Sequence, residues 1–228
     1  MIYEIAGLKV DMNPIHERMR KQSECYLSSG DPVIHVHSNP IDEGRVVMEE
    51  PNESDLEYIC YSADFCRKIV NHGRFFIHAS AVVYQGEAYL FSAPSGTGKS
   101  THTSFWNQVL PDTYILNDDK PVLQPVTNGV TVWGTPFAGK TDLHVNTHVP
   151  LKGICFLKQG NENRIRKLNE EEGLALLLNN TWRPSDMNMM NTLLDMMEQV
   201  VSNTGIYEMS CTESTEAALL SFHTMKGE

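Results

Sequence analysis

Short apolar runs alternate along the chain with segments in which apolar residues recur at helical spacing. The apolar runs predict strands over residues 3–10, 32–37, 75–83, 87–92, 113–116, 130–133, 150–157 and 206–209. Helical spacing and capping residues predict helices over residues 14–26, 54–71, 100–110, 169–178, 185–202 and 212–225. This alternation is typical of an α/β fold. We expect one domain over residues 1–228, with an N-terminal portion at 1–72 and a core at 73–228.

Capping residues mark the boundaries of two of these helices. Ser54, with Glu57 three residues later, predicts a capping box at the start of the helix over residues 54–71. Gly73 is the glycine expected to end that helix. Asn169 and Glu172 predict a second capping box.

A β-hairpin is predicted where residues 84–86, Tyr-Gln-Gly, separate two apolar runs. If the last two of these residues form the turn, Tyr84 pairs with Glu87 and His78 lies opposite Ala93. The second strand then has an antiparallel partner directly before it in the chain, and we expect a mixed sheet. The imidazole of His78 would lie at the mouth of the loop that follows the hairpin, where it is a candidate for function. The alternative is a core or edge histidine without a chemical role.

The loop after the hairpin has the pattern of a P-loop. Residues 93–101 read A-P-S-G-T-G-K-S-T, after an apolar strand and at the start of a predicted helix. Glycines let backbone N–H groups approach phosphate oxygens, the lysine brings positive charge to the outer phosphates, and the following serine hydroxyl is a ligand for Mg²⁺. The helix adds its positive N-terminal end. A small alanine stands first, where the pattern has glycine, and the alternative is a glycine- and serine-rich loop that matches by chance. We predict that nucleotide phosphates bind to Ser95, Gly96, Thr97, Gly98, Lys99, Ser100 and Thr101.

Two adjacent carboxylates end the next apolar run, where residues 117–120 read Asn-Asp-Asp-Lys. At the C-terminal end of a strand beside a P-loop, Asp118 and Asp119 are candidates for binding Mg²⁺ together with Ser100, and for a catalytic base. A solvated turn is the alternative. The four residues do not have the N-K-x-D order of a guanine signature.

Two loop cations are further candidates. Lys140 belongs to the loop over residues 134–141, which either closes over the nucleotide or the acceptor, or is only a turn. Arg183 lies between two predicted helices and either reaches a phosphate or is a solvated cation.

Composition narrows the class of partner. The formal net charge is −11, whereas a nucleic-acid-binding surface is basic, so we expect no nucleic-acid partner. Five cysteines without a C-x-x-C pair predict reduced thiols in a cytoplasmic protein. The N-terminus lacks the basic start of a signal peptide, and no apolar stretch approaches the length of a membrane span, so no membrane partner is expected.

These motifs resemble the HPr kinase/phosphorylase and phosphoenolpyruvate carboxykinase group. F-I-H-A-S-A-V-V-Y-Q-G-E-A-Y-L-F-S-A-P-S-G-T-G-K-S-T is similar to the segment of HPr kinases in which a histidine precedes the P-loop strand, and His78 stands in that place. Asn117-Asp118-Asp119 resembles their Ala-Asp-Asp, in which the second aspartate accepts the proton of the substrate serine. G-T-P-F-A-G-K and V-P-L-K-G-I-C-F-L-K-Q-G-N-E-N-R-I-R look like the small HPr-kinase-related proteins, some of which serve peptide-modification clusters. The likeness covers roughly residues 75 to 220.

Two features depart from that group. Thr131 stands where HPr kinases carry an acidic metal ligand one strand further on. Their arginine-containing loop for the protein acceptor has no clear counterpart, and Arg183 is the available stand-in. HPr itself is therefore not the acceptor we expect.

The resemblance implies an ATP- and Mg²⁺-dependent kinase that transfers the γ-phosphoryl group to a hydroxyl, either a serine of a peptide or protein or a small molecule. The catalytic set would be Asp119, His78, Lys99, Asp118 and Arg183. The alternative is a nucleotide-binding sensor or regulatory module without catalysis, and an enzyme acting on pyrophosphate or phosphoenolpyruvate is a third interpretation. The sequence leaves open whether the protein is a homo-oligomer.

Overall fold

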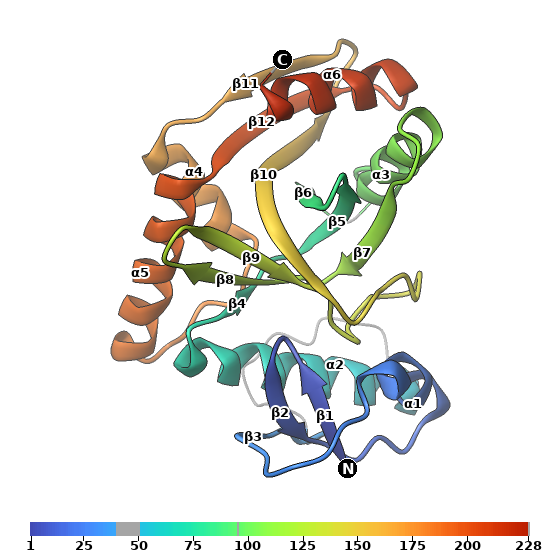
Figure 1. The fold of residues 1–228 in the computed structure, drawn as a ribbon, viewed down its shortest axis with the longest axis vertical. Coiled ribbons are helices and arrows are strands. Elements are labelled where there is room, and N and C mark those ends of the chain that lie inside the picture. The colour runs from blue at the N-terminus through green and yellow to red at the C-terminus, as the bar shows by residue number, and fades with distance from the viewer. Residues whose placement is uncertain (40–50, 95, 228) are drawn as a thin grey trace.

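A long mixed β-sheet forms the centre of the molecule in a computed structural model that describes residues 1–39, 51–94 and 96–227 (Figure 1). The strands are β1 (Ile2–Ile5), β2 (Leu8–Asp11), β3 (Ile34–His35), β4 (Phe75–Phe76), β5 (Ala79–Tyr84), β6 (Glu87–Ser92), β7 (Tyr114–Asp119), β8 (Val122–Val126), β9 (Gly129–Trp133), β10 (His148–Gln159), β11 (Arg164–Lys167) and β12 (Gly205–Cys211). The α-helices are α1 (Glu17–Ser23), α2 (Glu53–Lys68), α3 (Lys99–Val109), α4 (Glu170–Asn179), α5 (Met187–Asn203) and α6 (Thr215–Lys226), and short 3₁₀ helices cover Glu24–Tyr26 and Ile69–His72.

The central sheet runs in the order β4-β8-β9-β10-β6-β5-β7. In addition, β12 pairs with β10, and β11 pairs with β12. β6, β10 and β12 are parallel to one another, whereas β5 is antiparallel to both β6 and β7. The long strand β10 curves through the sheet and joins its two parts (Figure 1). The predicted mixed α/β fold is therefore confirmed, including the antiparallel strand directly before the strand that leads into the glycine-rich segment.

The hairpin between β5 and β6 has the register that the sequence predicted. Tyr84 pairs with Glu87, and the ladder continues to Ser80 opposite Phe91. The turn residues Gln85 and Gly86 both have positive φ angles, 52° and 80°, as a tight two-residue hairpin turn requires.

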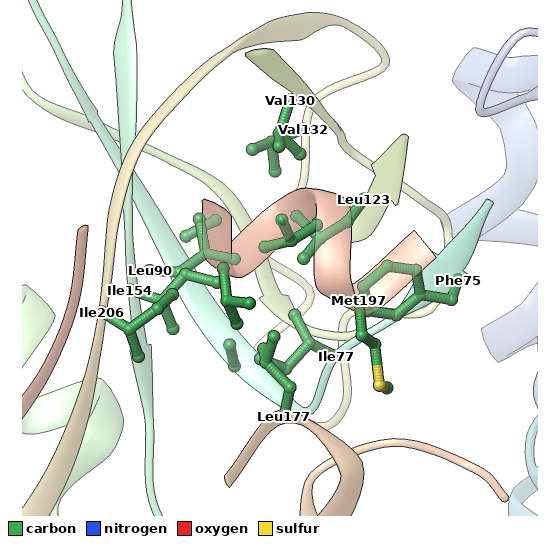
Figure 2. Packing of buried hydrophobic residues seen from close by; sticks show 14 of the residues in the cluster. Phe75, Ile77, Leu90, Leu123, Val130, Val132, Ile154, Leu177, Met197 and Ile206 are labelled. Carbon is green, nitrogen blue, oxygen red and sulfur yellow. The ribbon is translucent and has the colours of Figure 1, made fainter. Parts of the chain in front are cut away.

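Helices cover both faces of the central sheet. Alternate residues of the strands point to opposite faces, so Leu90 and Ile154 pack with α4 and α5, whereas Tyr89 and Cys155 pack with α3 and α6. Figure 2 shows the first of these clusters, in which Met197 of α5 lies among Phe75, Ile77 and Leu177. The methionine-rich helix thus uses part of its methionine set for core packing.

The N-terminal portion forms a second layer at one end of the sheet. β1, β2 and β3 make a small sheet, and α2 lies between it and the central sheet (Figure 1). The cluster that this portion buries includes Tyr3, Tyr26 and Phe65, and it extends to Val122 and Phe137 of the core portion. The two portions therefore share buried apolar contacts.

Several predicted boundaries were wrong. Residues 3–10 form two strands, because Ala6 and Gly7 turn the chain with positive φ angles of 51° and 71°. The run over 32–37 contributes only the two residues of β3. Strand β8 was not among the predicted strands, because it contains a proline, which is disfavoured inside a β-strand.

Helix ends were closer to expectation. The side chain that caps α2 is Asn52, which accepts from the N–H of Asp55, rather than Ser54. The capping box of Asn169 and Glu172 is present at α4. In the part of the chain that the structure describes, no helix combines the length and apolar character needed to cross a bilayer.

Candidate functional site

A cavity of about 360 Å³ brings together side chains from distant parts of the sequence. Lys99 and Ser100 come from the start of α3, and Asp118 and Asp119 come from the end of β7. His78 comes from the link between β4 and β5. The structure thus brings together His78, Lys99, Ser100, Asp118 and Asp119, five of the side chains for which the sequence predicted chemistry, but not Arg183 of the predicted catalytic set. The remaining wall is made by α1, α2 and residues 139–141.

The glycine-rich segment leaves β6 and leads directly into α3. Gly96 and Gly98 have φ angles of 81° and 97°, which residues with a side chain rarely adopt, and Gly98 is the cap residue of the helix. The N–H of Thr97 donates to the carbonyl of Pro94 at 3.1 Å and tightens the turn. Thr101 lies in the first turn of α3, whereas the predicted ligand Ser95 lies outside the described residues. The free N–H groups of a helix start make this end suited to an anion.

His78 connects the lysine of this segment to the acidic pair. Its Nε2 lies 3.3 Å from Nζ of Lys99 and 3.4 Å from Oδ1 of Asp119. Burial lowers the pKa of His78, and the positive charge of Lys99 adds to that effect more than Asp119 offsets it. The imidazole is therefore neutral at pH 7, and its Nε2 either accepts from Lys99 or donates to Asp119, but not both at once.

Ser100 and Asp118 form an adjacent pair of oxygen ligands. Oγ of Ser100 donates to the carboxylate of Asp118, with distances of 3.1 and 3.2 Å to its two oxygens. Magnesium prefers such oxygen ligands and typically takes one or two carboxylates together with substrate phosphates. The pair therefore fits the ion that the sequence predicted. No group of three or more His, Cys, Asp or Glu side chains arranged to hold a metal occurs among the described residues.

Asp119 is held from two sides. The hydroxyl of Tyr58 on α2 donates to its Oδ2 at 2.8 Å, and Nζ of Lys120 forms an ion pair with the same oxygen. Burial by itself would raise the pKa of Asp119, but the charge and hydrogen bond of Lys120, followed by His78 and Tyr58, outweigh burial and leave the pKa below its ordinary value. Asp119 is thus an ionised carboxylate with a fixed orientation.

Tyr58 and Lys120 are themselves affected by this arrangement. Burial raises the pKa of Tyr58 to about 12, so its hydroxyl stays protonated and acts as a donor. Burial would lower the pKa of Lys120, but Tyr58 and Asp119 reverse the effect and raise it, so the ammonium stays charged. Sequence reasoning missed both roles. Lys120 follows the acidic pair directly, whereas nothing in the local sequence singles out Tyr58.

Gly139 lines the cavity and lies close to Asp119. Its φ is 65°, and a Cβ there would lie 3.2 Å from Cβ of Asp119. Its N–H donates to the hydroxyl of Tyr58 at 2.9 Å. Its carbonyl accepts from Arg18 at 2.6 Å and from Gln22 at 3.3 Å, both on α1. The guanidinium of Arg18 also lies over the ring of Tyr58, 3.9 Å from its centre. The N-terminal helices therefore hold this loop against Asp119.

The loop cations have different positions. Lys140 lines the cavity, as expected if the loop over residues 134–141 lies over a bound molecule. Arg183 is exposed and is not among the residues that line the cavity, so its contact with a phosphate stays a prediction. Thr131 lies on β9, opposite Gln124 and Pro150, and also does not line the cavity.

The fold and the site define a class of protein: a mixed α/β domain with a curled sheet. The profile of the family described as "SynChlorMet cassette protein ScmC" matches residues 55–216, and the chain belongs to that family. Among solved structures, the HPr(Ser) kinase/phosphatase from Coxiella burnetii is similar at 10% identity and a TM-score of 0.38, over 67% of this chain and 95% of that one. A comparison with curated proteins finds no match.

Proposed function

We propose that this protein is an ATP- and Mg²⁺-dependent kinase that transfers the γ-phosphoryl group to a hydroxyl. The observation that carries the proposal is the position of His78, whose Nε2 lies 3.3 Å from Nζ of Lys99 and 3.4 Å from Oδ1 of Asp119. The Ser100–Asp118 pair lies in the same cavity. Catalysis of phosphoryl transfer depends mainly on positioning the reactants and on stabilising the charge that develops, and these side chains are suited to both roles.

The glycine-rich segment would act as the phosphate-binding P-loop. Backbone N–H groups over residues 95–101 and the start of α3 would cradle the β- and γ-phosphates. Lys99 would neutralise the charge that develops on the transferred group. Ser100, Asp118 and Asp119 would hold the magnesium ion, which supplies further positive charge next to the phosphates.

Asp119 would be the residue that takes the proton of the acceptor. In the transfer, the bond from the γ-phosphorus to the bridging oxygen of ADP breaks and a bond to the acceptor oxygen forms. The acceptor O–H bond also breaks, and its proton passes to Asp119. Because the transition state is loose, little base strength is needed, so a carboxylate of low pKa but fixed orientation suits the role. Neutral His78 would position the γ-phosphate between Lys99 and Asp119.

A nucleotide sensor without catalysis is the second candidate. Its specific support is the direct connection from Asp119 through Tyr58 to α2, which could pass nucleotide binding on to the N-terminal portion. A sensor without catalysis, however, has no acceptor hydroxyl, so it would leave the fixed carboxylate of Asp119 without a function.

Acceptor-dependent release of ADP separates these functions. The full chain is incubated with ATP labelled at the γ-phosphate, Mg²⁺ and a metabolite and peptide extract from its own cells, and mass spectrometry identifies what gains a phosphate. A kinase labels at least one acceptor and releases ADP in proportion to it. Binding of ATP with no labelled product in any fraction would contradict the proposal and favour the sensor.

A further inference from the structure

A second cavity, of about 380 Å³, adjoins the first and has no role in the proposed phosphate chemistry. The two share Arg18, Asp55, Gly139 and Lys140 in their walls. The second is completed by Lys21, Gln22 and Asp142. The two cavities therefore lie on either side of the contact between α1 and Gly139, and Lys140 lines both of them.

The charges around this second cavity leave one cation without a counter-charge. Arg18 is paired with Asp55, and Lys21 is paired with Glu17 at 2.9 Å. Asp142 lies 3.4 Å from Nε2 of His144, but burial lowers the pKa of this histidine, so the ring is neutral at pH 7 and Asp142 keeps its negative charge in the same wall. Lys140 is exposed, and within the described residues it forms no ion pair. In a chain with a net charge of −11, an unpaired ammonium in a cavity wall is suited to bind an anionic group.

Gln22 supplies a second, independent indication of a ligand. Its side chain is almost fully buried in the wall of the cavity, and Nε2 donates to the carbonyl of Gly139. Its Oε1 has no hydrogen-bond partner among the described residues. Buried polar atoms are nearly always satisfied in folded proteins, so this oxygen lacks a donor that an acceptor molecule could bring.

Lys140 follows Gly139, where an added Cβ would lie 3.2 Å from Cβ of Asp119. Lys140 and Asp119 also line the same cavity. A hydroxyl next to Asp119 and an anionic group next to Lys140 thus fit within one hydroxy-amino acid or within two neighbouring residues of a peptide.

We propose that the N-terminal helix α1 and residues 139–142 form the acceptor site, and that the acceptor is a serine-like hydroxyl compound with a carboxylate close to the hydroxyl. This inference rests on the proposed kinase function. The carboxylate binds Lys140, and an N–H of the acceptor donates to Oε1 of Gln22. The N-terminal portion would then supply acceptor selection, while the glycine-rich segment binds the nucleotide.

The test uses matched probes that differ only in the carboxylate. N-acetylserine is compared with N-acetylserinamide, and the blocked tetrapeptide acetyl-Gly-Ser-Asp-Gly-amide is compared with its Asn counterpart. Binding to the full chain is measured by calorimetry with ADP and Mg²⁺ present, so that no phosphate can be transferred. The first pair presents an α-carboxylate and the second a side-chain carboxylate, so the two arms distinguish the source of the charge.

We expect at least one carboxylate probe to bind about fivefold or more tightly than its amide partner. Lys140→Gln should abolish this preference. Lys152→Gln is the matched control, because Lys152 pairs with Glu87 at the far end of β6 from the glycine-rich segment, and it should keep the preference. Equal binding of the partners in both arms, a preference that survives Lys140→Gln, or no binding of any probe would each overturn the acceptor site.

The same probes with labelled ATP keep the two proposals apart. Selective binding of a carboxylate probe without any gain of phosphate contradicts the kinase function but supports the site. Equal phosphorylation of charged and neutral probes supports the kinase and overturns the site.

Discussion

The hydroxyl of Tyr58 donates to Oδ2 of Asp119 at 2.8 Å, and this bond joins a helix of the N-terminal portion to the end of β7. The same hydroxyl accepts from the N–H of Gly139 at 2.9 Å and from Lys120 at 3.3 Å. Tyr58 is therefore the point at which three parts of the chain fix the orientation of one carboxylate.

Tyr58→Phe should slow phosphoryl transfer while leaving ATP binding unchanged. The variant removes the donor to Asp119 and the acceptor of the Gly139 N–H, so the carboxylate and the loop lose their common support. We expect kcat to fall roughly tenfold, and the free energy of unfolding to fall by about 1–2 kcal/mol.

Tyr61→Phe is the matched control for that variant. Tyr61 is on the same helix, is equally buried, and its hydroxyl accepts from the N–H of Asn13 at 3.2 Å. It should lose comparable stability and keep its rate. A similar loss of kcat in both variants would show that Tyr58 acts only through the stability of the fold.

Gly139→Ala should reduce turnover beyond its effect on stability. The φ of 65° is costly for alanine, and the added Cβ would press against Cβ of Asp119 at 3.2 Å. Gly73→Ala has a nearly identical φ of 69° and no neighbour within 4 Å, so it isolates the backbone cost. Thermal unfolding should shift at least as much in the variant at residue 139 as in the variant at residue 73, and only the former should lose activity. Equal activity of the two variants would remove any role for the close approach.

Lys120→Met should move the acidic limb of activity to higher pH. Lys120 is the main cause that holds the pKa of Asp119 below its ordinary value, so its removal lets burial raise that pKa. Asp119 then becomes protonated at a higher pH than in the wild type, and the rate should fall earlier as the pH is lowered. The buried carboxylate left behind should also cost about 3 kcal/mol of stability. The pH profile of kcat is the measurement, and Lys120→Arg should restore part of the wild-type limb. An acidic limb at the same pH in both proteins would contradict the assignment of Asp119.

His102 should make the stability of the fold depend on pH. It is 4% exposed in the packing between α3 and α6, its Nε2 lies 3.0 Å from Oγ of Ser221, and burial lowers its pKa to about 4. The unfolded chain binds this proton near pH 6.5 and the folded chain only near pH 4. The stabilisation from a neutral His102 is thus complete above pH 6.5 and falls as the pH drops towards 4, by about 3 kcal/mol in total.

Chemical denaturation between pH 7.5 and pH 4 tests this dependence. His102→Gln should flatten the fall in stability, whereas His37→Gln, at an exposed histidine, should leave it as in the wild type. The same slope in the wild type and the His102 variant would contradict the prediction.

The sequence predicted most of what depends on local spacing. The turn over Gln85 and Gly86 fixes the hairpin register, and the register in turn places His78 near the glycine-rich segment, where it meets Lys99 and Asp119. The turn, the register and the position of His78 beside the glycine-rich segment depend only on residues close in the chain and on the two-residue period of a strand. They can therefore be predicted without knowledge of the fold.

The contacts made by the N-terminal portion could not be predicted in the same way. Tyr58 lies 61 residues from Asp119 in the sequence, and Arg18 lies 121 residues from Gly139. Their pairing depends on how α1 and α2 pack against the central sheet through Phe65 and Phe137, a long-range contact that no local pattern encodes. For the same reason, the sequence indicated only that Lys120 ends the Asn-Asp-Asp-Lys segment and did not predict its effect on Asp119.

The most direct test of the account is the effect of Asp119→Asn on two measurements made with the same samples. Binding of ATP with Mg²⁺ is measured by calorimetry, and transfer of labelled phosphate to an acceptor in the cell extract is measured by mass spectrometry. We predict that binding stays within about threefold of the wild type, whereas transfer falls by at least about a hundredfold, the usual contribution of a positioned base. Transfer at the wild-type rate by the variant would contradict the central claim that Asp119 takes the proton of the acceptor.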